Sequence, residues 1–120
     1  MKRANPEFAL HCTVADYLAW AMPEKYPVTH LPLGEKRDPK TAGKLKRMGV
    51  RPGWPDFLIL GPEGIIFIEM KADKGALSPA QKTFQERAKA LGYPCYVARS
   101  VSRVQEILEQ HGIQLRARAA

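Results

Sequence analysis

Residues 53–71 decide the fold of this chain, and they read GWPDFLILGPEGIIFIEMK. Two apolar runs rich in β-branched side chains flank the turn sequence GPEG, a pattern typical of a β-hairpin. A turn of these four residues pairs Leu60 with Ile65. Counting outward from that pair places Asp56 opposite Glu69. The hairpin is therefore expected to gather two carboxylates at its open end.

The pair Asp56 and Glu69 needs a compensating charge. Cross-strand partners have Cβ atoms roughly 4.5–5.5 Å apart, and two carboxylates at that separation repel each other unless a cation lies between them. Lys71 follows Glu69 by two residues, so strand alternation turns it to the same face. This arrangement indicates a divalent-metal site. The alternative is a hairpin end whose charged side chains lie in solvent.

The apolar side chains of the hairpin indicate where it lies in the fold. The face shared with the carboxylates carries Leu58, Leu60, Ile65 and Phe67, and the opposite face carries Phe57, Ile59, Ile66, Ile68 and Met70. A hairpin that is apolar on both faces has to be covered on both. We therefore expect a central hairpin in a sheet with helices on both sides.

The flanking segments predict an alternating α/β order. Expected helices cover residues 6–22, 39–48, 79–91 and 101–111, and expected strands or edge segments cover 26–33 and 93–98. Asn5, Asp38 and Ser78 mark three helix starts, because each can cap a helix and is followed by proline. A strand–helix–strand crossover makes the hairpin's second strand parallel to the strand at 93–98. The expected sheet is therefore mixed.

Size and charge are those of a basic single-domain protein. The chain has 120 residues, enough for one core, and its formal net charge of +7 favours an anionic partner, nucleic acid first. No apolar run approaches a membrane span, and no signal-peptide pattern is present. Cys12 and Cys95 lack metal-type spacing and are typical of buried thiols. We expect a cytoplasmic protein of bacterial or viral source, without a membrane partner.

Three motifs taken together resemble a known family. They are GVRPGWPD at 49–56, EMK at 69–71 and LSPAQ at 77–81. The combination is similar to the VRR-NUC domain, the virus-type replication-repair branch of the PD-(D/E)xK nuclease superfamily. The resemblance implies a restriction-endonuclease-like core in one domain over residues 1–113. A basic tail follows at 114–120, and its composition favours disorder.

The resemblance also implies roles for individual side chains. Asp56 and Glu69 are expected as metal ligands and Lys71 as the catalytic lysine. Gln81 matches the family's glutamine in the helix after the core strand, and Glu7 matches an acidic residue near the start of the first helix. The implied reaction is hydrolysis of DNA phosphodiester bonds with Mg²⁺ or Mn²⁺. Small members of the family resemble structure-selective enzymes that act as dimers on branched or Holliday-junction DNA.

The chemistry of the residues fits that reaction without the family name. Hard oxygen ligands suit Mg²⁺ or Mn²⁺, and the backbone carbonyl of Met70 is a further candidate ligand. Lys71 would orient an attacking hydroxide or offset charge in the transition state. Gln81 can instead cap its helix together with Ser78, and one side chain is not expected to fill both roles fully. Glu7 can instead serve the helix N-terminus electrostatically.

The three histidines are not expected in the site. His11 follows Glu7 by four residues and so shares its helical face. We interpret His11 as a helix-face residue rather than a ligand. His30 and His111 receive no role.

Residues 35–51 form the candidate DNA-binding segment. Lys40, Lys44 and Arg47 fall on one face of the expected helix, and Arg51 lies just beyond it, with Lys74 as a further candidate. Ala42, Leu45 and Met48 lie on another face and can pack. Such cations give salt-dependent affinity that is independent of base sequence. The alternative is an ordinary solvated basic face.

Three functions follow from these patterns. The first is a structure-selective DNA endonuclease that depends on a divalent metal. The second is a catalytically weak DNA-binding module of the same fold, and the third is an RNA- or ribosome-associated domain. Symmetric cutting of a junction needs two copies, so we expect a homodimer in which Trp20, Tyr26 and Leu33 build the contact.

Overall fold

The predicted hairpin lies at the centre of a four-stranded mixed sheet, within the residues that a computed structural model describes, 5–33 and 37–119. The strands are β1 (Val28–His30), β2 (Phe57–Gly61), β3 (Gly64–Met70) and β4 (Cys95–Ala98), in that spatial order. Leu60 pairs with Ile65 in the antiparallel β2–β3 ladder, which confirms the predicted register. β1 pairs antiparallel with β2, whereas β4 runs parallel to β3.

The helices begin where the sequence predicts. They are α1 (Pro6–Ala21), α2 (Pro39–Arg47), α3 (Pro79–Ala90) and α4 (Val101–Gln110). Asn5, Asp38 and Ser78 each accept a hydrogen bond from a backbone N–H in the first turn of their helix. Proline follows each of these caps, where its missing N–H costs no intrahelical hydrogen bond.

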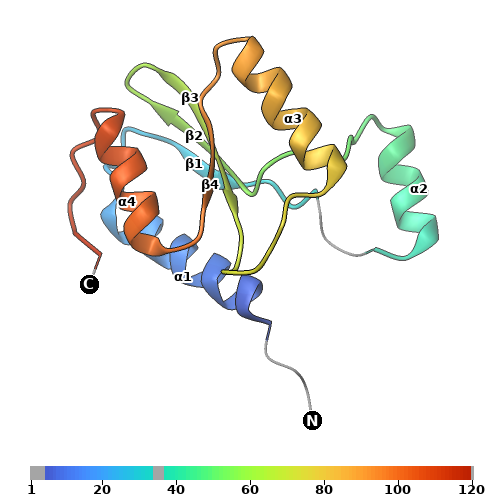
Figure 1. Cartoon of the computed structure of the whole chain (residues 1–120), viewed down its shortest axis with the longest axis horizontal. Helices are drawn as coiled ribbons and strands as arrows, with labels where there is room; N and C mark the ends of the chain where they lie inside the picture. Colours follow the sequence, from blue (N-terminus) through green and yellow to red (C-terminus); the bar gives the residue numbers. More distant parts are fainter. Residues whose placement is uncertain (1–4, 34–36, 120) are drawn as a thin grey trace.

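The main core lies between the sheet and the pair α1 and α4. These two helices cover one face of the sheet (Figure 1). That face presents the five hairpin side chains expected on it: Phe57, Ile59, Ile66, Ile68 and Met70. Val14 and Leu18 of α1 and Ile107 and Leu108 of α4 are buried against them. Burial of this size dominates the free energy of folding.

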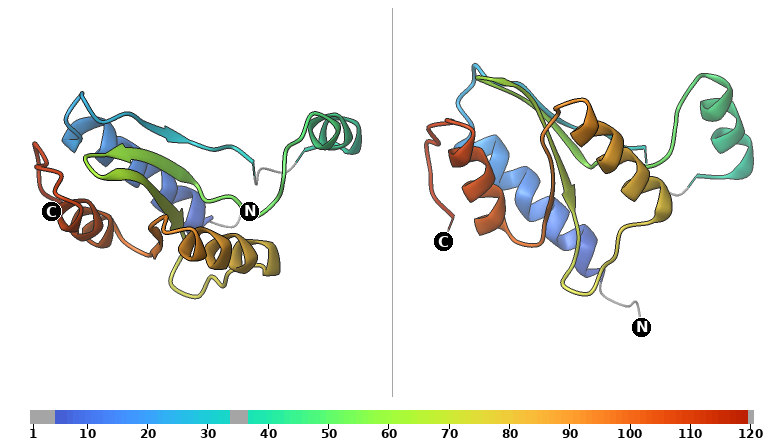
Figure 2. Two further views of the ribbon diagram at one scale, coloured as in Figure 1. Left: turned by 90° about the horizontal axis from the view of Figure 1, so that it is seen from above. Right: turned by 45° about the horizontal axis from the view of Figure 1, so that its top comes forward.

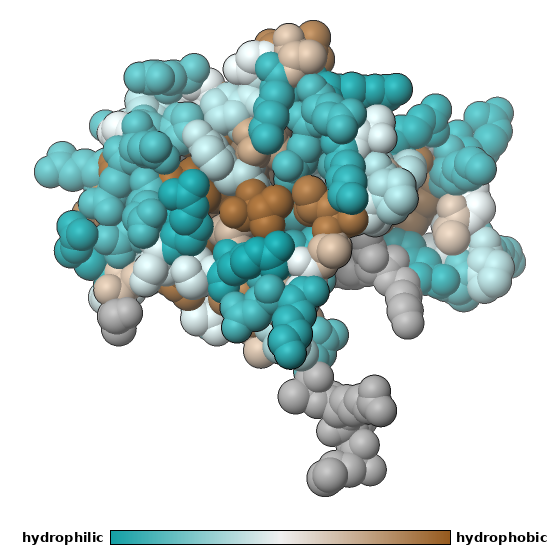
Figure 3. Space-filling view, viewed as in Figure 1, coloured by the Kyte–Doolittle hydropathy of each residue, from teal (hydrophilic) through white to brown (hydrophobic). Residues whose placement is uncertain are grey.

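The opposite face of the sheet is covered less completely, by α3 and by Trp54 in the loop before β2. Phe67, Ala88 and Cys95 are buried there, and Leu58, Ile65 and Phe84 pack against them as partly buried residues. The hairpin is therefore apolar and packed on both faces, as predicted, except at Leu60, which is 41% exposed. In the space-filling view, hydrophobic side chains gather near the centre of the viewed face, surrounded by hydrophilic ones (Figure 3).

Helix α2 stands apart from this body (Figure 2). None of its residues is buried, and Met48, at its end, is 71% exposed. Of the three side chains expected to be able to pack, only Leu45 is half-buried, and Ala42 is exposed like Met48. The predicted segment began at Glu35, and residues 34–36 lie outside the described residues.

The C-terminal tail lies against α1 and α4. The Arg116 backbone N–H donates to the carbonyl of Ala21, and the Tyr17 hydroxyl donates to the carbonyl of Ala117. Within this tail, whose composition favours disorder, the backbone of Arg116 and of Ala117 thus has defined partners, and Ala120 lies outside the described residues. Separately, among the described residues none of the helices has both the length and the apolarity needed to cross a membrane.

Candidate active site

Asp56 lies where the open end of the hairpin meets the first turns of α1 and α3. It immediately precedes β2, and Phe57 pairs with Ile68, so continuing the register places Asp56 opposite Glu69. The Met70 backbone N–H donates to Asp56 Oδ2 over 2.7 Å. This hydrogen bond fixes the Asp56 carboxylate to β3, and it confirms that the hairpin brings the two acidic residues together.

The loop before Asp56 is held against α3. Gly53 has a φ of +93°, and a Cβ atom there would collide with the carbonyl group of Ala80. Trp54 packs on Phe84 with ring centroids 4.7 Å apart and meets the edge of Phe67 at 6.0 Å. A side chain at position 53 would push this loop off the helix. The glycine and the tryptophan of the motif therefore set the position of Asp56.

Glu69 is a buried carboxyl group, 4% exposed. Burial, the hydrogen bond to Asp56 and the charge of Asp56 together raise its pKa to about 9, although the Lys71 charge acts in the opposite direction. Gln81 Nε2 donates to Glu69 Oε2 over 2.6 Å. Two adjacent carboxyl groups can share a proton or be neutralised by a cation, so the site favours binding of positive charge.

Gln81 fills both roles that the sequence presented as alternatives. Its Oε1 accepts from the Ser78 backbone N–H over 2.9 Å, and its backbone N–H donates to the Ser78 hydroxyl oxygen over 3.2 Å. Its Nε2 donates to Glu69. The two ends of one amide thus complete the capping box and contact the buried carboxyl, so the expectation that one side chain cannot do both is wrong.

Lys71 closes the site on the side of α1. It is 9% exposed, and its Nζ lies 3.8 Å from Glu7 Oε1. Its backbone N–H donates to the carbonyl of Ala98 in β4. The structure therefore places Glu7 beside Lys71, and its role at the site stays a prediction.

The loop after Lys71 is held by Arg99. One guanidinium nitrogen of Arg99 donates to the carbonyls of Ala72 and Gly75, at 2.6 and 2.9 Å. Lys74 is exposed on this loop. Sequence reasoning did not identify Arg99, because its partners are backbone atoms more than twenty residues away.

Two histidines that were assigned no role in the site lie beside Asp56. His11 Nδ1 is 3.7 Å from Asp56 Oδ1, and His30 Nδ1 is 2.8 Å from the Asp56 backbone oxygen. The four-residue spacing from Glu7 to His11 is the signal that could have placed His11 here. His30 is brought in by the β1–β2 ladder, where it pairs with Phe57.

The donor atoms fit a divalent cation. Asp56 and Glu69 supply adjacent carboxylate oxygens, and Glu7 adds a third carboxylate that is half exposed. Oxygen-rich sets of this kind suit Mg²⁺ and Mn²⁺. A bound cation would also offset the burial and the Asp56 charge that together raise the pKa of Glu69.

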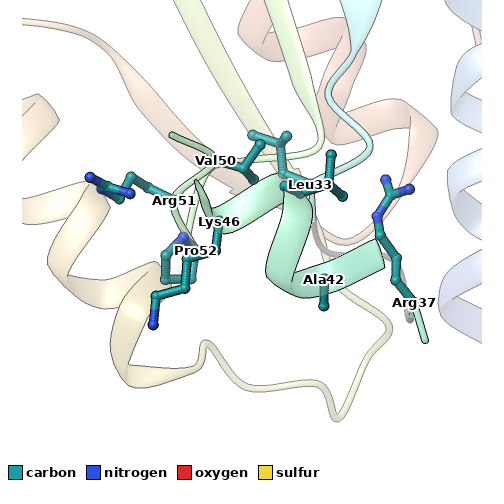
Figure 4. Close-up of a pocket in the computed structure, with 8 residues that line it drawn as sticks. Leu33, Arg37, Ala42, Lys46, Val50, Arg51 and Pro52 are labelled. Atoms are coloured by element: carbon teal, nitrogen blue, oxygen red, sulfur yellow. The ribbon is translucent and has the colours of Figure 1, made fainter. Parts of the chain in front are cut away.

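The cations of the DNA-binding prediction lie outside this cluster. Lys40, Lys44 and Arg47 are exposed on α2. Arg51 lines a hollow of about 320 Å³ beside α2, together with Arg37 and Lys46, which sequence reasoning did not single out (Figure 4).

Comparisons with known proteins agree with this description. A model of the VRR-NUC domain matches residues 6–102. A solved structure named VRR_NUC domain protein has a TM-score of 0.71 and 26% identity, covering 92% of this chain and 90% of that chain. Another, named VRR_NUC domain, has a TM-score of 0.58 and 22% identity, covers 90% of this chain and 99% of that chain, and supports the fold alone. None of the curated proteins compared with the chain matches it. The resemblance and the fold predicted from the sequence are confirmed.

Proposed function

The chain belongs to the VRR-NUC family, and from that premise we propose that it is a divalent-metal-dependent endonuclease that hydrolyses phosphodiester bonds in branched DNA. The observation that carries the proposal is the contact between Asp56 and the buried Glu69, with Lys71 beside them. Burying a carboxyl group such as Glu69 beside a second, half-buried carboxylate is costly for stability, so this arrangement suits phosphoryl chemistry better than it suits stability.

Asp56 and Glu69 would hold Mg²⁺ or Mn²⁺, with the carbonyl of Met70 and the carboxylate of Glu7 as further candidate ligands. When bound, such an ion polarises the phosphodiester and lowers the pKa of a bound water. Gln81 orients the Glu69 carboxyl through its 2.6 Å hydrogen bond. Lys71 contributes positive charge where the transition state gains negative charge.

Contacts to phosphate rather than to bases would give the protein its affinity for DNA. Lys40, Lys44 and Arg47 on α2, with Arg51 and Lys74, supply exposed cations. A helix that projects from the body can follow a DNA backbone around a branch (Figure 2). Selectivity for branched or Holliday-junction DNA is therefore proposed to come from shape.

A homodimer is part of this proposal, because one small domain reaches one cleavage site and a junction presents two related by symmetry. Of the three apolar residues expected in the dimer contact, Trp20 is the best candidate, since its side chain is exposed, at 64%. Tyr26 packs on the core, and Leu33 lines the hollow beside α2, so both are less available. Sedimentation at micromolar concentration should show a dimer, and Trp20→Arg should shift it to monomer. A wild-type monomer under these conditions would remove the dimer from the proposal.

A labelled substrate panel tests the function. It comprises a four-way junction, a flap, a splayed arm, plain duplex and single-stranded RNA, each with Mg²⁺, Mn²⁺ or EDTA. We expect metal-dependent cutting of a branched DNA and little cutting of RNA. Tight binding without cleavage in every metal would favour the DNA-binding module, and preference for the RNA would favour the RNA-associated domain.

A further inference from the structure

We propose that His11, His30 and Asp56 form a site for a nitrogen-favouring transition-metal ion of the Zn²⁺ class, beside the carboxylate centre. Candidate ligand atoms of the three side chains all lie within 4.8 Å of one another. The inference goes beyond the proposed function, because it concerns ion binding in the absence of DNA.

The geometry is close to that of a metal site. In a tetrahedral zinc site with bonds of about 2.0–2.1 Å, neighbouring ligand atoms lie about 3.4 Å apart. His11 Nδ1 and Asp56 Oδ1 are 3.7 Å apart. The ring centroids of His11 and His30 are 4.4 Å apart in an edge-to-face arrangement. Small side-chain rotations would therefore bring the three groups around one ion.

Hydrogen bonding and packing orient the two imidazoles. A carbonyl oxygen can only accept, so His30 Nδ1–H must donate to the Asp56 backbone oxygen at 2.8 Å. This contact selects the tautomer in which Nε2 carries the lone pair, the arrangement that is common for histidines that bind metals. His11 stacks on Phe57, with centroids 4.7 Å apart and an interplanar angle of 24°. Both rings thus have defined directions before an ion arrives.

Donor chemistry separates this site from the carboxylate centre. Imidazole nitrogens suit Zn²⁺, Co²⁺ and Ni²⁺, whereas Mg²⁺ prefers oxygen. Asp56 is shared between them: Oδ2 accepts from the Met70 N–H, and Oδ1 is the oxygen near His11. The open end of the hairpin would thus present an oxygen-rich centre and a nitrogen-containing one side by side.

The test is Co²⁺ titration of the full chain without a histidine tag or DNA, because the absorption spectrum of Co²⁺ reports ligand type and geometry. We expect one ion per chain with nitrogen and oxygen ligands. His11→Gln and His30→Gln should each weaken binding by about 10–100-fold or more, since losing even a second-shell partner costs about that much. His111→Gln is the matched control, because His111 hydrogen-bonds to Tyr96 and lies near the β2–β3 turn, at the other end of the hairpin.

Unchanged Co²⁺ affinity in both His11→Gln and His30→Gln would overturn the proposal. A second measurement covers variants that do not fold: in the wild-type protein, Co²⁺ should shift or broaden the imidazole NMR signals of His11 and His30 and leave those of His111 in place. Equal effects on all three histidines, or on none, would contradict the site. A chain that cuts DNA but binds no Co²⁺ would refute this inference alone.

Discussion

Glu69 is the residue on which the behaviour of the site depends most. It is buried beside Asp56, and Gln81 donates a hydrogen bond to it. The positive charge of Lys71 partly offsets the effect of burial and of the Asp56 charge on its pKa. Its pKa of about 9 means that the folded, metal-free protein holds a proton that an unfolded glutamate, with an ordinary pKa of 4.5, would release. Proton binding and metal binding should therefore compete at this carboxyl.

The first prediction concerns stability against pH in EDTA. Because the folded state raises the pKa of Glu69, the stabilisation from its proton is complete below the unfolded value of 4.5 and is lost as pH rises through about 9. The free energy of unfolding should thus fall across this window, and Glu69→Gln should flatten the fall. Urea unfolding at several pH values measures the free energy of unfolding for both proteins.

The matched control for this measurement is Glu63→Gln, in the exposed hairpin turn. It should follow the wild-type pH profile. Excess Mg²⁺ or Mn²⁺ should reduce the fall in wild type, because the ion replaces the proton. A Glu69→Gln profile as steep as the wild-type profile would show that Glu69 does not hold the proton.

At the scale of elements, the first turn of α3 joins helix capping to the site. Ser78 and Gln81 cap the helix reciprocally, and Gln81 also reaches Glu69. Ser78→Ala should cost about 0.5–2 kcal/mol of stability with cleavage largely retained. Gln81→Glu keeps an acceptor for the Ser78 N–H but places a second carboxyl against Glu69, so it should reduce cleavage far more than stability.

Comparing unfolding and cleavage rates for the two α3 variants separates the roles. A Gln81→Glu enzyme with wild-type cleavage would reduce Gln81 to a capping residue. A Ser78→Ala enzyme that loses cleavage while remaining folded would mean that the cap itself sets the site.

Helix α2 is expected to contribute much of the affinity for DNA. Lys44→Ala with Arg47→Ala removes two exposed cations from a helix with no buried residue, so stability should change little. If both contact phosphates, the slope of log affinity against log salt should fall by about 1.8, roughly 0.9 per contact. Fluorescence anisotropy at several salt concentrations measures this slope.

Lys25→Ala with Lys89→Ala is the charge-matched control for α2, since both lysines are exposed, Lys25 in the turn after α1 and Lys89 on α3. This pair should leave the slope near the wild-type value. An equal fall in the salt slope for the two double variants would indicate a diffuse charge effect rather than binding along α2.

At the scale of the whole molecule, local patterns predicted most of the fold. The turn fixed the register that places Asp56 opposite Glu69, and cap residues marked the starts of three helices. These signals act within a few residues of the chain, so no tertiary information is needed to interpret them. Parallel pairing of β3 with β4 followed from the handed crossover through α3.

The features of the fold and the site that the sequence did not predict depend on contacts between distant segments. His30 reaches Asp56 only because a three-residue edge strand pairs with β2, and so short a strand leaves a weak pattern in sequence. The amphipathic pattern of α2 indicates an apolar stripe but not whether anything covers it. Arg99 acts on backbone carbonyls, which have no side-chain signature.

The central claim is that Asp56 takes part in metal-dependent hydrolysis, and the most direct test is cleavage of a four-way junction by wild type and Asp56→Asn in Mg²⁺, Mn²⁺ and EDTA. An asparagine oxygen can still accept from the Met70 N–H, so the variant keeps the 2.7 Å anchor and loses the charge. We predict cutting by wild type in Mg²⁺ or Mn²⁺, none in EDTA, and a loss in Asp56→Asn of about 100-fold or more, the size of effect that removing one preorganised group produces. Cutting in EDTA, or undiminished cutting by a folded Asp56→Asn protein, would contradict it.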